Sequence, residues 1–294
     1  MPSTRDIRRR IKSVKNTAQI TKAMEKVASA KMRKAQQAAL AGRPYVDLMN
    51  GMLAAATASA GEFTHPLMEQ RPVKKRAVIV VSTDKGLCGS LNTNLLREAG
   101  RFDAESSLFL TAGRKSEQWT ARAKRTVAER FTYRDNPKFS EAMAICRKAC
   151  ELFTSGEVDQ VDIVFTNFIS TLNQKPLVRQ LLPIIELKPL SASVKDEEST
   201  ASVPESKVSE FQFEPTATDV LGSLLPKYVN YQIYQVLLEA KASEHSSRMV
   251  AMKNATDNAK QLVKDLTLEY NKIRQANITK ELLEITSAAM AMGN

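Results

Sequence analysis

The feature that most restricts the fold of this chain is a long C-terminal stretch without a helix breaker. No glycine or proline occurs between Pro226 and Gly293, which leaves 66 uninterrupted residues from Lys227 to Met292. As one helix this run would extend roughly 100 Å, at about 1.5 Å per residue. A membrane span is excluded because charged side chains recur along it: Lys241, Glu244, Arg248, Lys253, Asp257, Lys260, Lys264 and Asp265. The run, starting near Leu221, predicts a coiled coil.

Two apolar seams, one near each end of the chain, give this coiled coil a partner. The C-terminal seam steps alternately by three and four residues: Met252, Ala255, Ala259, Leu262, Leu266, Glu269, Ile273, Ala276 and Lys280. An N-terminal seam has the same spacing: Ile7, Ile11, Val14, Ala18, Thr21, Glu25, Ala28, Met32, Ala35 and Ala39. Alanine in both seams allows two helices to approach closely, so we expect an antiparallel N- and C-terminal pair. Gly42 and Pro44 should interrupt the first helix.

The residues between the two long helices have the character of an α/β domain. Strands are expected at 76–84, 107–113, 161–168 and 176–183, with helices near 95–99, 115–124 and 139–153. This alternation predicts a small parallel sheet, Rossmann-like, with an antiparallel edge at the 176–183 strand. Residues 189–210 are polar and predict a mobile loop, and 211–215 could add a short edge strand. The predicted division is therefore 1–60 (N-terminal coiled-coil helix), 61–210 (central α/β domain) and 211–294 (C-terminal coiled-coil helix).

The turn after the first strand, at 84–92, is the stretch most like a chemical motif. A glycine-bearing strand-to-helix turn is where α/β folds bind phosphate groups, which leaves open an enzyme that binds a phosphorylated ligand. Neither GxGxxG nor GxxxxGK[ST] occurs in the chain. The competing interpretation is structural: Gly86 and Gly89 permit tight turning while Ser90 or Asn92 caps the next helix.

Cysteine and histidine are too few and too scattered to predict a metal site or a disulfide framework. The chain has three cysteines and two histidines, none in paired ligand spacing. Cys146 and Cys150 lie one helical turn apart, and we interpret them as reduced cysteines in or near a core. Neither His65 nor His245 belongs to a visible acid–base constellation. We expect no catalytic residue, no cofactor and no metal.

Positive charge is concentrated at the N-terminus. The formal net charge is +11, and residues 1–43 hold twelve Lys or Arg against two acids. Such a segment binds nucleic acid, anionic lipid or an acidic protein surface. The cations share a helix with an apolar seam and lack interleaved aromatic residues, which disfavours nucleic acid. A solvated basic face, an acidic protein partner and a nucleic-acid scaffold remain as alternatives, in that order.

Four segments resemble one family. They are IKSVKNTAQITKAMEKVASAKMRKAQ at 11–36, TDKGLCGSLN at 83–92, EHSSRMVAMKNATDNA at 244–259 and YNKIRQANITKELLEI at 270–285. Together they are similar to the gamma subunit of F-type ATP synthases, in the right order and at a typical total length.

The resemblance implies a central rotor stalk that couples rotation of the membrane c-ring to ATP synthesis or hydrolysis at the beta subunits. In that family the terminal helices form an antiparallel coiled coil inside a hexamer of alpha and beta subunits, and the chain itself is not catalytic. The implied partners are alpha, beta, epsilon and the c-ring, with no nucleic acid. Because the chain begins without a visible transit peptide, we expect a peripheral position on the cytoplasmic face of a bacterial inner membrane.

Two groups of residues match family positions that contact the beta subunit. Lys22, Met24 and Lys26 match the stretch near an acidic segment of beta, and Arg274, Gln275 and Thr279 match positions that hydrogen-bond beta loops. The C-terminal tip is apolar beyond a single stripe, which fits rotation in an apolar sleeve. Its stripe is Ile278, Leu282, Ile285, Ala289 and Met292, and the apolar residues Ala288, Met290 and Ala291 lie beside that stripe.

Overall fold

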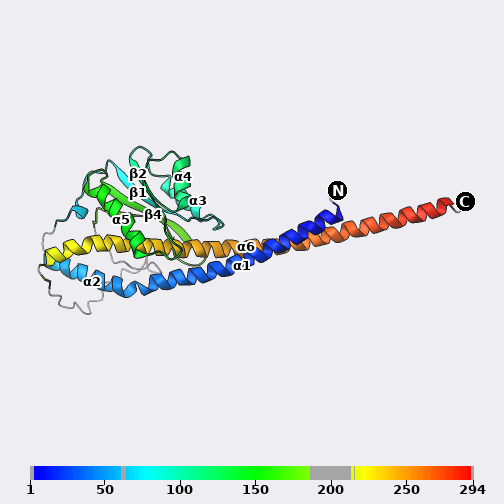
Figure 1. The fold of residues 1–294 in the computed structure, drawn as a ribbon, viewed down its shortest axis with the longest axis horizontal. Helices are drawn as coiled ribbons and strands as arrows, with labels where there is room; N and C mark the ends of the chain where they lie inside the picture. Colours follow the sequence, from blue (N-terminus) through cyan, green and yellow to red (C-terminus); the bar gives the residue numbers. More distant parts are fainter. Residues whose placement is uncertain (1–2, 61–63, 186–212, 215, 293–294) are drawn as a thin grey trace. The chain divides into compact units, whose positions relative to one another are not determined.

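The computed structural model describes residues 3–60, 64–185, 213–214 and 216–292. The chain divides into two compact units, one made of residues 1–27 with 249–294 and the other of residues 28–248. Two long helices run through both units, α1 (Thr4–Ala41) and α6 (Ala217–Met292) (Figure 1). Among the described residues, no helix is long and apolar enough to cross a membrane.

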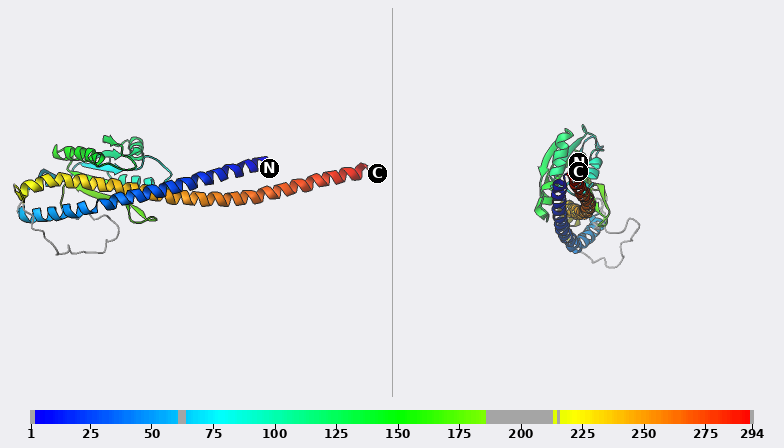
Figure 2. Two further views of the ribbon diagram at one scale, coloured as in Figure 1. Left: turned by 60° about the horizontal axis from the view of Figure 1, so that its bottom comes forward. Right: turned by 90° about the vertical axis from the view of Figure 1, so that its right-hand side faces the viewer.

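In the first unit α1 and α6 lie side by side in opposite directions, which confirms the predicted antiparallel pair (Figure 2). Arg8 Nη2 donates to the Tyr270 hydroxyl at 2.6 Å, and the hydroxyls of Thr21 and Thr256 lie 2.7 Å apart. The chain therefore pairs low residue numbers of α1 with high numbers of α6. All ten positions of the predicted α1 seam are buried or half-buried.

The predicted α6 seam is only partly right. Its buried or half-buried members are Met252, Ala255, Ala259, Leu266 and Ile273, whereas Leu262, Glu269, Ala276 and Lys280 are exposed. The stripe that faces inward steps by four and three: Met252, Thr256, Ala259, Val263, Leu266, Tyr270 and Ile273. Steps of three and four fit a helical stripe in either order, and over residues 252–273 each order contains six apolar residues among seven. In the structure, α6 is turned so that Thr256 lies opposite Thr21, and the two hydroxyls form a hydrogen bond with each other.

The seam also ends earlier than predicted. Since α1 begins at Thr4 and Arg8 already contacts Tyr270, α6 continues beyond the end of its partner helix. From Arg274 to Ala288 every described side chain is exposed. The last turns of α6 are thus a single helix that protrudes beyond the helical pair.

At its other end α6 begins earlier than the sequence predicted. It starts at Ala217 and includes Pro226. Thr216 caps this end, because its Oγ1 accepts from the backbone N–H of Asp219 at 3.2 Å and donates to the Asp219 carboxylate at 2.7 Å. A proline inside a helix removes one backbone hydrogen bond, and buried neighbours such as Leu225 and Val229 offset this loss.

The predicted break in the first helix is confirmed. α1 ends at Ala41, Gly42 forms a turn, and α2 covers Arg43–Ala60. The Tyr231 hydroxyl on α6 donates to the Gly42 carbonyl at 3.1 Å. A side chain at residue 42 would collide with this hydroxyl, so the glycine permits the close approach as well as the turn.

The α/β domain, residues 64–185, holds a sheet of five strands. They are β1 (Arg76–Val81), β2 (Ser107–Ala112), β3 (Val127–Phe131), β4 (Gln160–Phe168) and β5 (Gln174–Leu182), and they lie in the order β3-β2-β1-β4-β5. The first four are parallel, and β5 is antiparallel to β4, as predicted. β3 was missed because its sequence, VAERF, has two charged residues and only half-buried apolar ones.

Helices cover both faces of this sheet. One face of β1 (Val78 and Val80) packs with α3 (Leu91–Ala99) and Trp119 of α4 (Arg114–Arg122). The other face (Ala77, Ile79 and Val81) shares a larger core with α5, α2 and the first half of α6. α5 covers Phe139–Thr154, and a single 3-10 turn, η1, covers Pro66–Met68. The domain is thus a three-layer α/β structure that uses the long helix as part of one layer.

Two sequence predictions fall largely outside the described residues. The loop at 189–210 lies entirely there. Of the proposed edge strand at 211–215, only Phe213 and Glu214 are described, and neither is in a strand.

Gly113, between β2 and α4, provides a test of the packing of the sheet. Its φ is +99°, and an added Cβ would collide with the backbone carbonyl of Ser82. We expect Gly113→Ala to lower the free energy of unfolding by at least about 2 kcal/mol, as strain and collision add. Gly51→Ala is the control, since Gly51 is exposed in α2 with open space around it and should gain up to about 1 kcal/mol. Urea unfolding followed by circular dichroism measures both; an equally stable Gly113→Ala protein would contradict the described backbone.

Candidate functional site

The sheet has a crevice at the place where doubly wound folds bind ligands. β2 lies on one side of β1 and β4 on the other, so connections leave β1 and β4 in opposite directions, and the gap beyond their carboxyl ends is the usual site. Here α6 fills it. Ser247 Oγ donates to the Cys88 carbonyl at 2.7 Å, and Ser243 Oγ donates to the Thr166 carbonyl at 2.9 Å.

The β1–α3 turn therefore binds the long helix in place of a phosphate. Gly89 adopts a φ of +58° with Ser247 Oγ next to it, which confirms the expected tight turning. Ser90 is the N-cap of α3 but makes no side-chain capping hydrogen bond. Asn92 instead holds the turn together, since its side chain contacts the Thr83 hydroxyl at 2.8 Å. The structural interpretation of this turn is confirmed at Gly89, whereas the other positive φ of the turn, +63°, belongs to Leu87 and not to Gly86, and the capping role is wrong.

A buried charge cluster, Lys241, Glu244 and Arg248 of α6, lies next to this contact, and the exposed side chains of Asp135 in the loop before α5 and of Lys31 on α1 extend it to the surface. The Glu244 carboxylate accepts from Lys241 Nζ at 3.0 Å and from Arg248 Nη2 at 2.8 Å. Asp135 pairs with Lys31 and lies 3.7 Å from Lys241 Nζ. Lys241, Glu244 and Arg248 are at most 9% exposed.

The buried cluster ties α6 to the α/β domain, and the exposed Lys31–Asp135 pair adds a weaker contact to α1. Arg248 Nη2 also donates to the carbonyls of Lys85 and Gly86, at 3.4 and 3.3 Å. The Lys31 ammonium holds the pKa of the Asp135 carboxyl below its ordinary value. Buried ions are stable only when each has its partners, and removal of one partner costs about 3–5 kcal/mol. The cluster therefore resists any movement of α6 against the domain.

The Tyr133 ring also packs against the Lys241 side chain. The Lys241 ammonium lies 4.4 Å from the centre of the Tyr133 ring, and the Tyr133 hydroxyl donates to the Ser82 carbonyl at 2.8 Å. Burial raises the pKa of this phenol well above its ordinary value, so it stays a neutral donor. The ring and the ammonium attract each other as a cation–π pair.

His245 is the one imidazole in this region, and it is buried. Arginine can only donate, so the 3.3 Å contact from Arg248 Nη1 makes His245 Nδ1 an acceptor and places the proton on Nε2. Nε2 is buried and has no hydrogen-bond partner within the part of the chain that the structure describes. Burial lowers the pKa of His245 to about 4. The imidazole is therefore neutral at physiological pH and is not poised as an acid–base catalyst.

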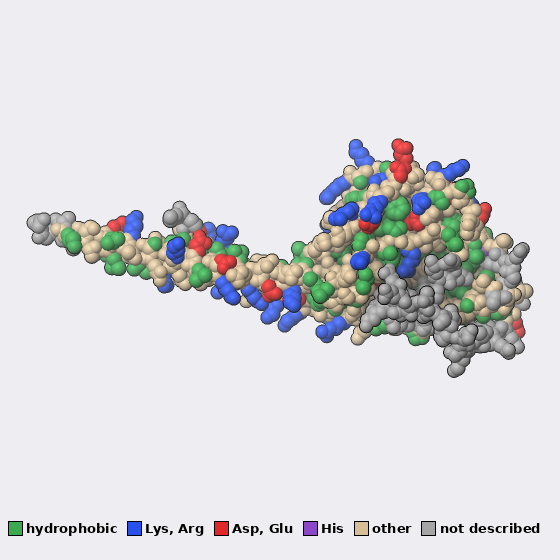
Figure 3. All heavy atoms as spheres, turned by 180° about the vertical axis from the view of Figure 1, so that it is seen from behind, with side chains coloured by type: hydrophobic (Ala, Val, Ile, Leu, Met, Phe, Trp, Pro, Cys, Tyr) green, Lys and Arg blue, Asp and Glu red, His purple; other side chains and the backbone are tan. Residues whose placement is uncertain are grey.

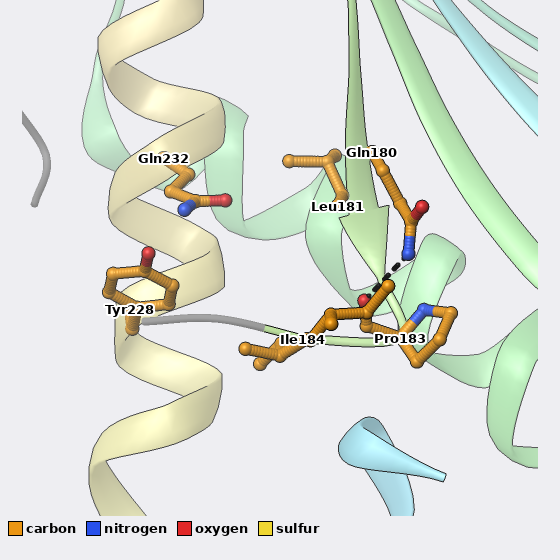
Figure 4. Close-up of a pocket in the computed structure, with 7 residues that line it drawn as sticks. Gln180, Leu181, Pro183, Ile184, Tyr228 and Gln232 are labelled. Carbon is orange, nitrogen blue, oxygen red and sulfur yellow. Dashed lines mark hydrogen bonds between the residues drawn. The ribbon is translucent and has the colours of Figure 1, made fainter. Parts of the chain in front are cut away.

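A separate hollow of about 300 Å³ lies between β5 and α6 (Figure 4). Its lining is Gln180, Leu181, Pro183, Ile184, Ile185, Tyr228 and Gln232. None of these seven side chains carries a charge, and the Gln180 amide already donates to the Pro183 carbonyl at 3.0 Å. The hollow offers no group for catalysis.

The two predicted groups of contact residues lie at different positions along the helical pair of the first unit. Lys22 and Lys26 are exposed and Met24 is half-buried on α1, whereas Arg274, Gln275 and Thr279 are exposed on α6. Thr21 pairs with Thr256, and Arg274 lies 18 residues further along α6, or about 27 Å at the rise of a helix. The structure thus brings each group together on its own helix and keeps the two groups apart.

The apolar tip is exposed where its side chains are described. Ile278, Leu282 and Ile285 are 48%, 57% and 65% exposed. Ala289 and Met292 lie within α6, but their side chains are outside the described residues. Isolated exposed leucines are ordinary, whereas a run of them on a protruding single helix is typical of a surface covered by another protein. Figure 3 shows Lys and Arg side chains along the helical pair and more hydrophobic ones toward this tip.

Sequence reasoning missed the buried charge cluster. Lys241, Glu244 and Arg248 were read only as charges that exclude a membrane span, and their spacing is equally typical of a solvated face. One signal was available: Ser243, Ser246 and Ser247 form a run of small polar residues inside a long helix, which permits a backbone to approach closely. Asp135 and Lys31 had no such signal, because only the fold brings them to α6.

Removal of the central charge should destabilise the protein. We expect Glu244→Gln to lower the free energy of unfolding by about 3–5 kcal/mol, because two buried cations lose their shared carboxylate. Glu284→Gln is the matched control on the same helix: its partner Lys280 is 3.7 Å away and both are mostly exposed, so its loss should stay below about 1 kcal/mol. Urea unfolding compares the two, and equal losses would disprove a structural role for the cluster.

His245 should make stability depend on pH in a defined window. The unfolded imidazole binds a proton near pH 6.5, whereas the folded one does so only near pH 4. Between these values the unfolded state binds more protons, so stability falls as pH falls, by about 3 kcal/mol in total. His245→Gln should remove this slope. Unfolding curves of both proteins from pH 7.5 to pH 4 measure it, and identical slopes would contradict the assignment.

Comparisons with known proteins agree with the resemblance. The family model described as ATP synthase matches residues 3–292. ATP synthase gamma chains of Methylacidiphilum infernorum and Opitutus terrae are 47% and 48% identical, over 100% and 99% of both chains in each case.

Solved structures show the same fold. A chain of the Euglena gracilis mitochondrial ATP synthase structure of the OSCP, F1 and c-ring has a TM-score of 0.68 at 19% identity, over 98% of this chain and 94% of that one. A chain of the Tetrahymena thermophila mitochondrial central stalk and c-ring has a TM-score of 0.57 at 24% identity, over 80% and 99%. The chain belongs to the ATP synthase gamma chain family, whose members are non-catalytic and form the central rotor stalk of the complex.

Proposed function

We propose that this chain transmits torque because the buried charge cluster fixes the α/β domain to the long helix α6. A stalk that couples rotation at one end to catalysis at the other must not let its parts slip. Glu244, with its two cations, and the hydrogen bonds from Ser243, Ser247 and Arg248 to domain carbonyls supply such a tie. This cluster is the single observation that carries the proposal.

We propose the following partners. The helical pair turns inside the ring of alpha and beta subunits, and the α/β domain contacts epsilon and the c-ring, so that the functional division is 1–60, 61–210 and 211–294. The complex is membrane-associated, and the chain itself is peripheral on the cytoplasmic face of a bacterial inner membrane. Relatives of full length from bacteria support this assignment. The chain needs no cofactor for a mechanical role.

Two sets of contacts with beta are proposed from the exposed residues of the first unit. Lys22 and Lys26, with Met24 between them, offer a basic face to an acidic segment, while Arg274, Gln275 and Thr279 offer hydrogen-bond donors further along α6. Exposed ion pairs are worth at most about 1 kcal/mol. Contacts of this strength form and break as the stalk turns, whereas a buried pair would hold it at one angle.

The exposed tip is proposed to rotate in an apolar sleeve. Ile278, Leu282 and Ile285 are exposed on a part of α6 that has no partner helix within the described chain, and the sequence places Ala289 and Met292 on the same stripe. Apolar contacts are non-directional, so they hold such a helix on its axis at every angle. This fits a bearing better than hydrogen bonds would.

The beta contact at Arg274 is open to a direct test. We expect the double variant Arg274→Ala and Gln275→Ala, assembled with alpha and beta subunits, to lower coupled turnover roughly fivefold, which corresponds to about 1 kcal/mol in the barrier. Lys253 and Asn254, also exposed on α6, provide a control that likewise removes one cation and one side-chain amide. Their double Ala variant should retain the wild-type rate.

The same preparation distinguishes the rival functions. The purified chain should be catalytically silent and should restore ATPase activity when mixed with alpha and beta. A wild-type rate for the Arg274 and Gln275 double variant would refute that contact alone. Tight DNA binding with a steep salt dependence would instead favour the nucleic-acid scaffold.

A further inference from the structure

A second pocket lies between α5 and α6 and contains sulfur on one wall. Its volume is about 410 Å³, and its lining is Ser140, Met143, Ala144, Cys146, Arg147 and Cys150 of α5 with Pro226 and Asn230 of α6. Met143, Cys146 and Cys150 are spaced three and four residues apart, so all three lie on one helical face. Met143 is 47% exposed, Cys150 is half-buried and Cys146 is buried. The pocket is distinct from the buried charge cluster.

We propose that Met143, Cys146 and Cys150 form a binding site for a soft monovalent metal ion, Cu(I). Thiolate and thioether sulfur are the ligands that select Cu(I) over harder metals. Two thiols and one thioether can supply the three sulfur ligands that a three-coordinate ion needs. The proposal is independent of the rotary function and concerns a face of α5 that the rotor argument does not use.

The distance between the two thiols decides between chelation and a disulfide. Cys146 Sγ and Cys150 Sγ are 3.7 Å apart. Two sulfurs bound to one ion at about 2.3 Å lie roughly 3.8–4.0 Å from each other, for tetrahedral and trigonal angles. A disulfide needs an S–S distance of about 2.05 Å and Cβ atoms within about 4.5 Å, whereas Cβ atoms one helical turn apart are about 5–6 Å apart. An ion fits between these thiols with little movement, and a disulfide would distort α5.

The charges around the pocket favour the same ion. A Cu(I) ion with two thiolates has a net charge of −1, and the Arg147 guanidinium in the pocket lining offsets it. Binding releases the thiol protons to solvent and changes no oxidation state.

Zinc fits this pocket less well. Structural zinc sites use four Cys, His or carboxylate ligands. Within the described residues no three His, Cys, Asp or Glu side chains are grouped to hold a metal. The remaining polar groups of the pocket lining, Ser140 and Asn230, are weak ligands for zinc. The predicted reduced cysteines in or near a core are confirmed, since Cys146 is in the core and Cys150 packs against it, and the proposal adds that both also line the pocket.

Copper titration of the purified full-length chain tests the proposal. With ascorbate under anaerobic conditions and bicinchoninate as competitor, we expect one Cu(I) per chain. Cys146→Ser and Cys150→Ser should each weaken binding at least about 100-fold, and Met143→Leu about tenfold. Cys88→Ser is the matched control. Cys88 is the third cysteine and lies in the β1–α3 turn, so its replacement should leave Cu(I) affinity unchanged.

A second measurement needs no cysteine variant. Cu(I) bound to the wild-type chain should block alkylation of Cys150 by iodoacetamide, as read by mass spectrometry, and Met143→Leu should reduce this protection. The proposal is overturned if the chain does not compete with bicinchoninate, if binding disappears with Cys88→Ser, or if Cu(I) leaves Cys150 alkylation unchanged. None of these results depends on rotation or ATPase activity, so failure here leaves the rotor assignment intact.

Discussion

Glu244 lies between two buried cations at the point where the long C-terminal helix crosses the end of the sheet, and the rest of the structure depends on this contact. Its carboxylate holds Lys241 and Arg248, Arg248 reaches the β1–α3 turn, and Asp135 connects Lys241 to Lys31 on the other long helix. A buried ionic contact often contributes little net stability compared with apolar packing. It does fix one arrangement, because any slip leaves a charge without its partner. For a stalk, geometry of this kind matters more than total stability.

The helical pair is held together by small side chains and not by buried charges. Its seam contains Ala18, Ala259 and the hydroxyl pair Thr21–Thr256, so the two backbones lie close together and the pair is thin. Such a seam buries little apolar area per turn, and a longer contact offsets this. A narrow seam is acceptable here because the α/β domain supplies a conventional core of aliphatic and aromatic residues.

The sheet has the strand order of a nucleotide-binding fold without the corresponding site. The turn at 84–92 keeps the glycines and the place in the fold, yet its carbonyls accept hydrogen bonds from Ser247 and Arg248. A phosphate requires backbone N–H groups that point into an open crevice. The same topology therefore binds a helix at this position. Function has to be inferred from the residues of the site and not from the fold.

The sequence alone determined the elements whose signals are local and repeated. The long run without glycine or proline, the α1 seam, the break at Gly42 and four of the five strands were predictable, because periodicity and helix breakers act within a few residues. The resemblance of four segments also identified the family. The α6 register was not predictable, since steps of three and four fit Leu262 as well as Val263, and only the opposing Thr21 decides between them. β3 was hidden by its charged residues, and the extension of the buried charge cluster to Asp135 and Lys31 by the distance in sequence between Lys31, Asp135 and Glu244. Those features were decided by the tertiary structure, because burial and ion pairing depend on which distant residues the fold brings together.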